Sequence, residues 1–351
     1  MLAPVLHILP LATIVRERTL PVAGKVSARL DQRVSPTDVV AEANYAREHV
    51  LLDVARVYGI SANAADKLIK VNQGDRLTQD ALVAEARGMF ARPIKAPRPG
   101  RVMVAGGGQV LMEVGDARIE LRAGMPGVVT QIIPERGVVI RTVGALIQGT
   151  WGNGRIDNGM MVNLLEKPDA VLAPDRLDIN KRGSVILGGH VREAETLRAA
   201  AELPVRGLIL SSMLSSLLPT AVQMRFPILV VDGFGAMPMN TAAFNLLTSN
   251  NGREVTVNAE PFDRYNGNPP EVIIPLPVSS DPPEPNAYVP FAVGQRVRMR
   301  RSPNAGMLGT VASLPAGLSL LPSGLRALAG EVKLENGATV LAPLVNLEVV
   351  G

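Results

Sequence analysis

Between residues 167 and 262, short apolar runs alternate with segments whose apolar residues have helical spacing, and this is the clearest pattern in the chain. Ala194, Leu197 and Ala201 are spaced i, i+3 and i+7, which predicts a helix over residues 193–203. The apolar runs predict buried strands at 184–189, 205–210, 226–231 and 253–259. Strands that alternate with helices predict a small, mostly parallel α/β domain of three to four strands.

Two further helices are expected in the same region. Asn240 is a suitable N-cap, and the residues that follow place Ala243 and Leu247 on one face. The other helix is expected over residues 213–224, where Pro219 interrupts it.

Residues 1–166 show a different pattern, in which short β-prone runs are separated by Gly and Pro. Residues 31–43 and 74–86 resemble each other at an offset of 43 residues, and both end in the letters VAEA. Residues 94–104 follow the second copy with a Pro-Gly turn and a strand, and residues 125–129 repeat that Pro-Gly-x-Val pattern. Repeated short strands with Gly and Pro turns predict a compact β barrel or sandwich.

This pattern resembles the biotinyl/lipoyl-type domain, or barrel-sandwich hybrid, over roughly residues 15 to 150. The resemblance implies a carrier with a modified lysine at a hairpin tip. The corresponding position falls near Arg87 or Gly88, where this chain has no lysine, and Lys95 lies in the following strand instead. We therefore expect the fold without the carrier chemistry, and no cofactor.

Residues 263–287 are rich in proline and predict a semi-rigid linker, within which residues 271–277 form a strand docked on a neighbouring domain. Residues 288–351 read as short alternating strands, with a hairpin at the Asn-Gly of 335–337. With the Pro-x-x-Gly-x-x-Gly-x-Val turn at 303–311, this region resembles KOW-type, SH3-like barrels. The resemblance implies contact with RNA, a ribonucleoprotein or a protein partner.

Arginines on one predicted strand are the candidate contacts for that partner. Strand alternation places Arg296, Arg298 and Arg300 on one face, and Arg301 extends the patch. Such a stripe predicts phosphate binding that weakens with salt. The alternative is a solvated strand face that is kept basic against edge pairing.

The α/β domain holds a second candidate site, because ligands of parallel sheets lie beyond the carboxyl ends of the strands. A hydrolytic triad would consist of His190, Ser211 and Asp232. Backbone N–H groups and a hydroxyl suit a small ligand or anion at this edge, from Gly188, Gly189, Ser212, Gly233 and Gly235. The G-x-S-x-G pattern of a serine nucleophile is missing, so a structural or partner-binding role is favoured and an enzymatic role stays open.

Composition narrows the functional classes. The chain of 351 residues has no cysteine and three separated histidines, which exclude thiolate chemistry and disfavour a metal site. The net charge of +4 is compatible with nucleic acid but is low for a dedicated binder. The N-terminus lacks a signal-peptide pattern, and no apolar run approaches the ~18 residues of a membrane span, so a cytoplasmic protein away from membranes is expected.

The fold class expected is therefore mixed β and α/β, in three domains. These are a barrel-sandwich hybrid at 1–166, the α/β domain at 167–262 and, after the 263–287 linker, a KOW-like barrel at 288–351. The arrangement resembles uncharacterised bacterial multidomain proteins, which implies no activity. We expect a non-catalytic scaffold or adaptor, with the α/β ligand or hydrolytic site as the alternative, and exposed strand edges leave a homo-oligomer open.

Overall fold

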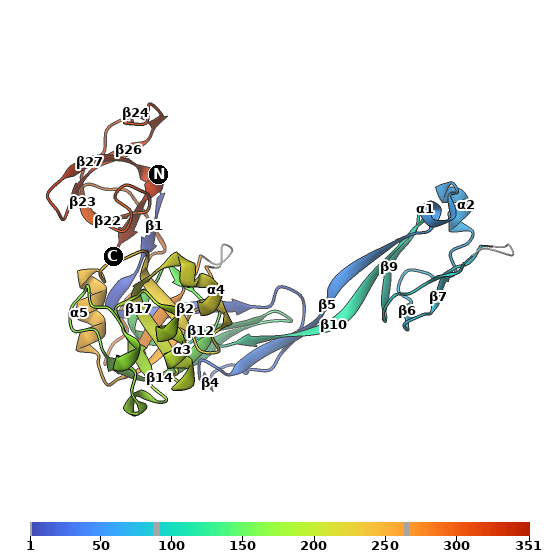
Figure 1. Ribbon diagram of the computed structural model, residues 1–351, viewed down its shortest axis with the longest axis horizontal. Coiled ribbons are helices and arrows are strands. Elements are labelled where there is room, and N and C mark those ends of the chain that lie inside the picture. The colour runs from blue at the N-terminus through green and yellow to red at the C-terminus, as the bar shows by residue number, and fades with distance from the viewer. Residues whose placement is uncertain (1, 87–91, 263–266) are drawn as a thin grey trace.

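The computed structural model describes residues 2–86, 92–262 and 267–351. The protein is β-rich, and a long two-stranded stalk separates a body from a small distal tip (Figure 1). The stalk consists of β5 (Val39–Asp53) and β10 (Gln109–Arg122), and the tip is residues 54–108. We define the C-terminal unit as residues 288–351 together with β1 (Leu2–Leu6), and the body as the remainder.

A large mixed sheet runs through the body. Its strands, in spatial order, are β13 (Trp151–Gly152), β18 (Ile228–Phe234), β17 (Gly207–Met213), β15 (Val185–Leu187), β14 (Ile156–Asn163), β19 (Glu254–Asn258), β20 (Glu271–Pro275), β12 (Gly137–Gln148), β11 (Gly127–Ile133) and β4 (Arg33–Val34). Two further strands join this sheet, β2 (Ile8–Thr19) on β12 and β16 (His190–Val191) on β17. The registers of β14, β15, β17 and β18 are parallel, which confirms the small parallel unit.

The predicted helices form beside this parallel unit. They are α3 (Ala194–Glu202), α4 (Leu218–Gln223) and α5 (Thr241–Ser249), with short 3-10 turns η1 (Pro174–Arg176), η2 (Ile179–Lys181) and η3 (Ser215–Leu217). The N-cap prediction is confirmed, because the Asn240 side chain accepts a hydrogen bond of 2.9 Å from Ala243 N. Pro219 lies in the first turn of α4 and does not interrupt a helix, since the first turn needs no N–H donor from it.

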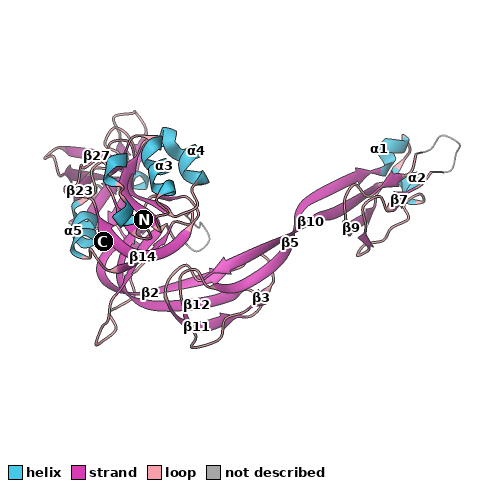
Figure 2. Ribbon diagram, turned by 60° about the horizontal axis from the view of Figure 1, so that its bottom comes forward, coloured by secondary structure: helices cyan, strands magenta, loops and turns pink. Residues whose placement is uncertain are grey.

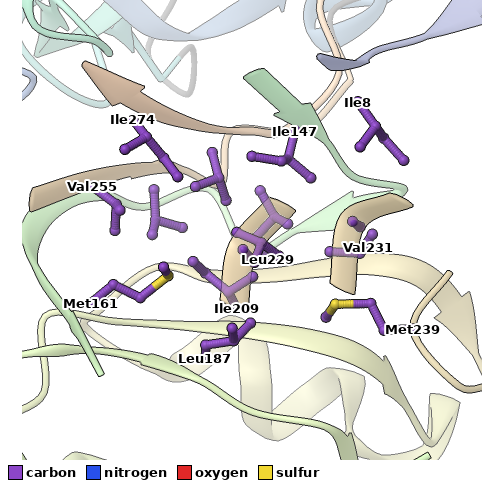
Figure 3. Close-up of a cluster of buried hydrophobic side chains, with 14 of the residues drawn as sticks. Ile8, Ile147, Met161, Leu187, Ile209, Leu229, Val231, Met239, Val255 and Ile274 are labelled. Carbon is purple, nitrogen blue, oxygen red and sulfur yellow. The ribbon is translucent and has the colours of Figure 1, made fainter. Parts of the chain in front are cut away.

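One hydrophobic core crosses the expected domain boundaries (Figure 3). It joins Ile8 and Ile147 from the N-terminal region to Leu187 and Leu229 of the α/β unit, and it reaches Val350 near the C-terminus. Strand β14 also belongs to the parallel sheet, although it precedes residue 167. The expected domain boundaries at 166 and 262 therefore do not separate independent cores, because strands far apart in the sequence pack into a common core.

The C-terminal unit is a seven-stranded sheet. Its spatial order is β21 (Tyr288–Pro290), β1, β28 (Leu347–Val350), β22 (Arg296–Met299), β23 (Leu308–Ser313), β26 (Ala329–Leu334) and β27 (Thr339–Pro343). A small hairpin of β24 (Ser319–Leu320) and β25 (Arg326–Ala327) and the turn η4 (Leu344–Asn346) complete it. The Asn-Gly hairpin is confirmed between β26 and β27. The N-terminal strand lies in this unit because β1 pairs in parallel with β28.

The segment expected as a linker contributes to the body. Strand β20 is buried between β19 and β12, which confirms the docked strand predicted at 271–277. Beyond it, the carbonyl oxygens of Pro282 and Pro283 accept hydrogen bonds from Thr13. Most of this proline-rich segment is therefore held against the body.

The stalk projects the tip away from the body in both views (Figures 1 and 2). Its strands pair antiparallel along their length, and 14 residues of β10 correspond to about 45 Å at the usual rise. The tip contains α1 (Val54–Tyr58), α2 (Ala62–Asp66), β6 (Arg76–Leu77), β7 (Leu82–Ala84), β8 (Ile94–Lys95) and β9 (Gly100–Gly106). It has its own core of buried residues, which includes Val83 and Val102 of the tip and Met112 from the outer end of the stalk.

The sequence repeat corresponds to two nested copies of one structural element. Residues 31–43 pair with 123–129 at the base of the stalk, whereas residues 74–86 pair with 96–102 in the tip. Gly100 and Gly127 are equivalent, since a Cβ at either would lie 2.1 Å or 2.4 Å from a carbonyl oxygen of the next strand. The single module expected over residues 15–150 is thus two modules, one inserted within the other. The Arg87–Gly88 position lies outside the described residues.

Candidate functional site

A cavity of about 720 Å³ lies where the parallel strands of the body meet the C-terminal unit. Asp232, Gly233 and Phe234, at the end of β18, form one wall, and Arg298 and Glu348 of the C-terminal unit form another. This is the carboxyl end of the parallel strands, where ligands of such sheets bind. The expected ligand region is therefore hollow, and a second unit of the chain helps to enclose it.

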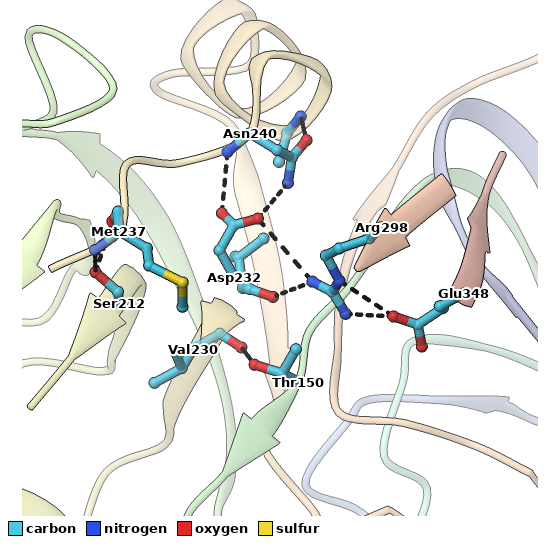
Figure 4. A network of polar contacts seen from close by, with 10 residues as sticks. Thr150, Ser212, Val230, Asp232, Met237, Asn240, Arg298 and Glu348 are labelled. Atoms are coloured by element: carbon cyan, nitrogen blue, oxygen red, sulfur yellow. Dashed lines mark hydrogen bonds and ion pairs between the residues drawn. The ribbon is translucent and has the colours of Figure 1, made fainter. Parts of the chain in front are cut away.

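A buried ion cluster forms one side of the cavity (Figure 4). Arg298 donates to Glu348 from Nε at 3.1 Å and from Nη2 at 2.5 Å, and its Nη1 donates to the Val231 carbonyl at 3.2 Å. The Asp232 carboxylate lies 4.0 Å from Nη1 and accepts two hydrogen bonds from Asn240. Burial raises the pKa of Asp232, and the Asn240 hydrogen bonds and Arg298 oppose that rise. The cluster joins the two units, since Arg298 contacts both.

The prediction of an exposed arginine stripe is wrong for its central residue, Arg298. The side chain of Arg298 is only 6% exposed, because β22 is covered on both faces near its end. Arg296 is partly buried and pairs with Glu335 at 2.9 Å. Arg300 and Arg301 are exposed, and Arg300 also lines the cavity.

Arg16, which also lines the cavity, forms a second buried ion pair. Arg16 donates to Glu271 through Nε and Nη2, the latter at 2.6 Å. Beside it, His7 is buried, and burial, together with the positive charge of Arg16, lowers the pKa of His7 to about 4, against the opposing effect of Glu271. His7 is therefore neutral at pH 7 and offers an uncharged imidazole to the cavity.

The three residues proposed as a triad do not assemble as one. His190 Nδ1 lies 2.9 Å from Ser212 Oγ, not from Ser211. The Ser212 hydroxyl donates to the Met237 carbonyl at 2.6 Å and accepts from Met237 N at 3.1 Å, so Nδ1 must be the donor to it. His190 consequently does not act as a base toward Ser212. The contact instead fixes the loop that carries Met237 into the cavity wall.

Ser211 and Asp232 are positioned for other roles. The side chain of Ser211 points to the other face of β17 and is fully buried, and its hydroxyl has no hydrogen-bond partner among the described residues. The hydrogen bonds of Asp232 in the described chain go to Asn240, and its ion-pair partner is Arg298. No hydrogen bond in the described chain links His190 to Asp232, so hydrolytic chemistry finds no support in this arrangement.

The glycines expected to bind an anion serve mainly close packing. A Cβ on Gly188 would lie 2.8 Å from the Leu172 side chain, and one on Gly189 would lie 1.7 Å from the Ala170 carbonyl oxygen. Gly233 and Gly235 have φ of 130° and 108°, which suit the turn after β18. Of this set, Gly233 lines the cavity.

Sequence reasoning missed the residues that organise the cavity. Three of them, His7, Arg16 and Glu348, line it, and Glu271 pairs with Arg16. All four lie in or beside apolar β runs, and a charged residue in such a run was the available signal. Their partners could not be read from the sequence, since Arg16 and Glu271 are 255 positions apart.

In residues 2–86, 92–262 and 267–351, no group of three or more His, Asp or Glu side chains is placed to hold a metal ion. Within these same ranges, no helix has the length and apolar character needed to cross a bilayer.

A scan against protein-family models and a search of curated proteins both find no match, so neither comparison assigns the chain to a family.

We expect Arg298→Met to lower the free energy of unfolding by about 3–5 kcal/mol, because it leaves Glu348 and Asp232 buried without their cation. The matched control is Arg296→Met, which breaks a largely solvated pair and costs less than about 1 kcal/mol. Urea unfolding of both variants measures the difference. Equal losses would contradict the bridging role of Arg298.

We expect the protein to lose stability as the pH falls from 6.5 to about 4, partly through His7. In this window the unfolded chain binds a proton at residue 7 that the native state does not bind, so unfolding becomes more favourable, by up to about 3 kcal/mol. His7→Gln should reduce the slope of unfolding free energy against pH. His49→Gln, which removes an exposed imidazole from the stalk, is the control for the loss of a histidine. Identical slopes for wild type and His7→Gln would exclude the buried neutral imidazole.

Proposed function

We propose that this protein is a non-catalytic adaptor that holds the tip at a distance from its body. The observation that carries the proposal is the stalk, which pairs β5 with β10 over most of their length and separates two independent cores. Stalk strands about 45 Å long that carry a folded module at their far end suit a protein that contacts partners at two places. The resemblances to barrel-sandwich hybrid and KOW-type domains support the same role.

The middle of the stalk is its narrowest part. Strand β3 (Lys25–Val26) widens the sheet near the base, and β9 widens it near the tip, which leaves two strands between them. Ion pairs flank this neck, Arg118 of β10 with Glu42 of β5 on the body side and Arg98 of a tip loop with Glu48 of β5 on the tip side. They favour the extended arrangement, although exposed pairs each contribute little.

The partner proposed for the adaptor is RNA, a ribonucleoprotein or a protein. On the C-terminal unit, the burial of Arg298 leaves Arg300 and Arg301 as the exposed arginines of the predicted set. This is a small patch for a polyanion, since each phosphate contact adds only modestly to affinity. The C-terminal unit is therefore the weaker candidate for such a contact.

The adaptor proposal predicts an extended molecule in solution. The chain has no cysteine, so Asn63→Cys on α2 and Gln131→Cys on β11 give a unique pair of sites for spin labels. Pulsed electron resonance should give a mean separation of about 45 Å or more, because the stalk lies between the two sites.

The control pair for this measurement is Gln131→Cys with Asn245→Cys, which lies within the body and reports the labelling quality. The width of the first distribution reports bending at the neck. A short mean distance for the Asn63–Gln131 pair, with the control pair intact, would mean that the tip folds back on the body and would overturn the adaptor proposal.

A second candidate function is the binding of a small amphipathic anion in the cavity. Its walls combine apolar groups such as Leu6, Phe234 and Met237 with the neutral His7 and the exposed guanidinium of Arg300. The volume of about 720 Å³ is within the usual range for small-molecule sites.

Anilinonaphthalene sulfonate is a suitable probe, because it carries one anionic group on an apolar body. We expect saturable binding of one probe, weakened by Arg300→Ala and by Ala305→Trp, which would obstruct the cavity. Arg301→Ala removes a neighbouring charge that does not line the cavity and should leave binding unchanged. An equal effect of Arg300→Ala and Arg301→Ala would rule out a specific site.

A further inference from the structure

The tip carries an excess of positive charge that the whole-chain composition conceals. Residues 54–108 contain nine Lys and Arg and four Asp and Glu, a net charge of +5. The complete chain has a net charge of only +4, so the rest of the molecule is slightly acidic, at −1. The basic character of this protein is therefore located at the far end of the stalk (Figure 2).

The basic side chains of the tip are exposed and mostly lack ionic partners. Eight of them lie in the described residues and all are exposed: Arg56, Lys67, Lys70, Arg76, Arg92, Lys95, Arg98 and Arg101. Among the described residues, only Arg98 of this set forms an ion pair, with Glu48 of the stalk. In the body, by contrast, Arg16 and Arg18 are both held by carboxylates. The charges of the tip are thus available to an external anion.

Two of these arginines lie directly opposite each other. Arg76 on β6 and Arg101 on β9 are register partners in an antiparallel pair, which places their Cβ atoms about 5 Å apart. Two carboxylates lie nearby, Asp75, which accepts from Asn72 N at 2.8 Å, and Glu113, which is the register partner of Arg101 on β10. In the described residues neither of them forms an ion pair with Arg76 or Arg101. Like charges directly opposite each other repel, and an anion bound between them would relieve this repulsion. Two adjacent guanidinium groups suit phosphate oxygens well.

The distribution of the charges indicates the kind of anion. They lie on several elements of the tip, including α1, β6, β8 and β9, rather than along a single strand or helix. A nucleic-acid duplex presents phosphates on a curved, extended surface that such an arrangement can follow. Tyr58 is the one aromatic residue among the described residues of the tip, and its hydroxyl donates to the Arg92 carbonyl at 2.8 Å. Base stacking on an exposed ring is therefore not offered by these residues, which favours a duplex over a single strand.

We propose that the tip binds double-stranded nucleic acid through its phosphates, with Arg76 and Arg101 at the centre of the contact. This inference rests on the proposed adaptor function and identifies the partner at the distal end. It also moves the expected nucleic-acid contact from the C-terminal unit to the tip. Because the contact is with the backbone, binding should depend little on sequence and strongly on salt.

The test is fluorescence anisotropy of the full-length protein with a labelled duplex, measured between roughly 50 mM and 200 mM salt. RNA and DNA duplexes of the same sequence should bind with affinities within about tenfold of each other. Arg76→Ala with Arg101→Ala should weaken binding at least about tenfold and reduce the slope of log affinity against log salt by about two. Both arginines are exposed, so this variant should remain folded, which circular dichroism checks.

The matched control is Arg300→Ala with Arg301→Ala, which removes the same charge from the C-terminal unit. It should leave affinity and salt slope nearly unchanged. An equal or larger loss in this control, or no loss in the tip variant, would overturn the proposal. Tighter binding to vesicles that contain phosphatidylserine than to either duplex would also overturn it.

The outcome is separable from that of the adaptor proposal. An extended molecule that binds no duplex retains the adaptor function with another partner and loses only this inference. A tip that binds duplex while folded back on the body would retain the nucleic-acid contact and lose the adaptor function.

Discussion

Strand β12 hydrogen-bonds along both of its edges, and the positions of the body and the stalk depend on this pairing. One edge is covered by β2, and the other is shared by β11 in the first half and β20 in the second. Accordingly, Ile140 lies in the core at the stalk base, whereas Ile147 lies in the core beneath the α/β unit. A single strand thus aligns the stalk with the parallel sheet. The β2 partner continues from β1, so the same pairing brings the C-terminal unit over the strand ends.

Local features of this fold are readable from the sequence. The Asn240 cap, the Asn-Gly hairpin and the apolar strands of the α/β unit each depend on a few neighbouring residues, and the structure forms all of them. The 43-residue repeat is also visible, because both copies need the same turns. The sequence repeat does not show, however, whether the two copies pair with each other in one module or with other segments in two separate modules.

The features that could not be predicted depend on contacts between residues far apart in the sequence. Strand β1 pairs with β28, whose residues are more than 340 positions away, and no local signal specifies that contact. Arg298 follows the alternation of an exposed residue, but Glu348 and the Val231 carbonyl surround it in the folded chain. The candidate triad failed for a related reason. Two adjacent serines on a strand point to opposite faces, and the burial of each face depends on elements distant in sequence.

The treatment of charge differs between the two ends of the molecule. In the body and the C-terminal unit, Arg16, Arg18 and Arg298 pair with carboxylates at short range, and they contribute to holding separate segments together. In the tip, which has a small core and few acidic residues, the positive charges lie on the surface. The stalk keeps these two electrostatic environments well beyond the ~8–10 Å screening distance of physiological salt. Each end can therefore respond to its surroundings independently.

The nesting of the two repeat copies has a topological consequence. The chain enters and leaves the tip through adjacent strands, and Ala43 lies opposite Ile119 in their register. The ends of the intervening segment are therefore only about 5 Å apart, a gap that a short hairpin turn can close. In this sense the tip and outer stalk form a cassette, whose removal breaks no strand pairing within the body. The body thus keeps its own strand pairing whatever module is inserted at this point, so the same body can carry modules of different surface chemistry.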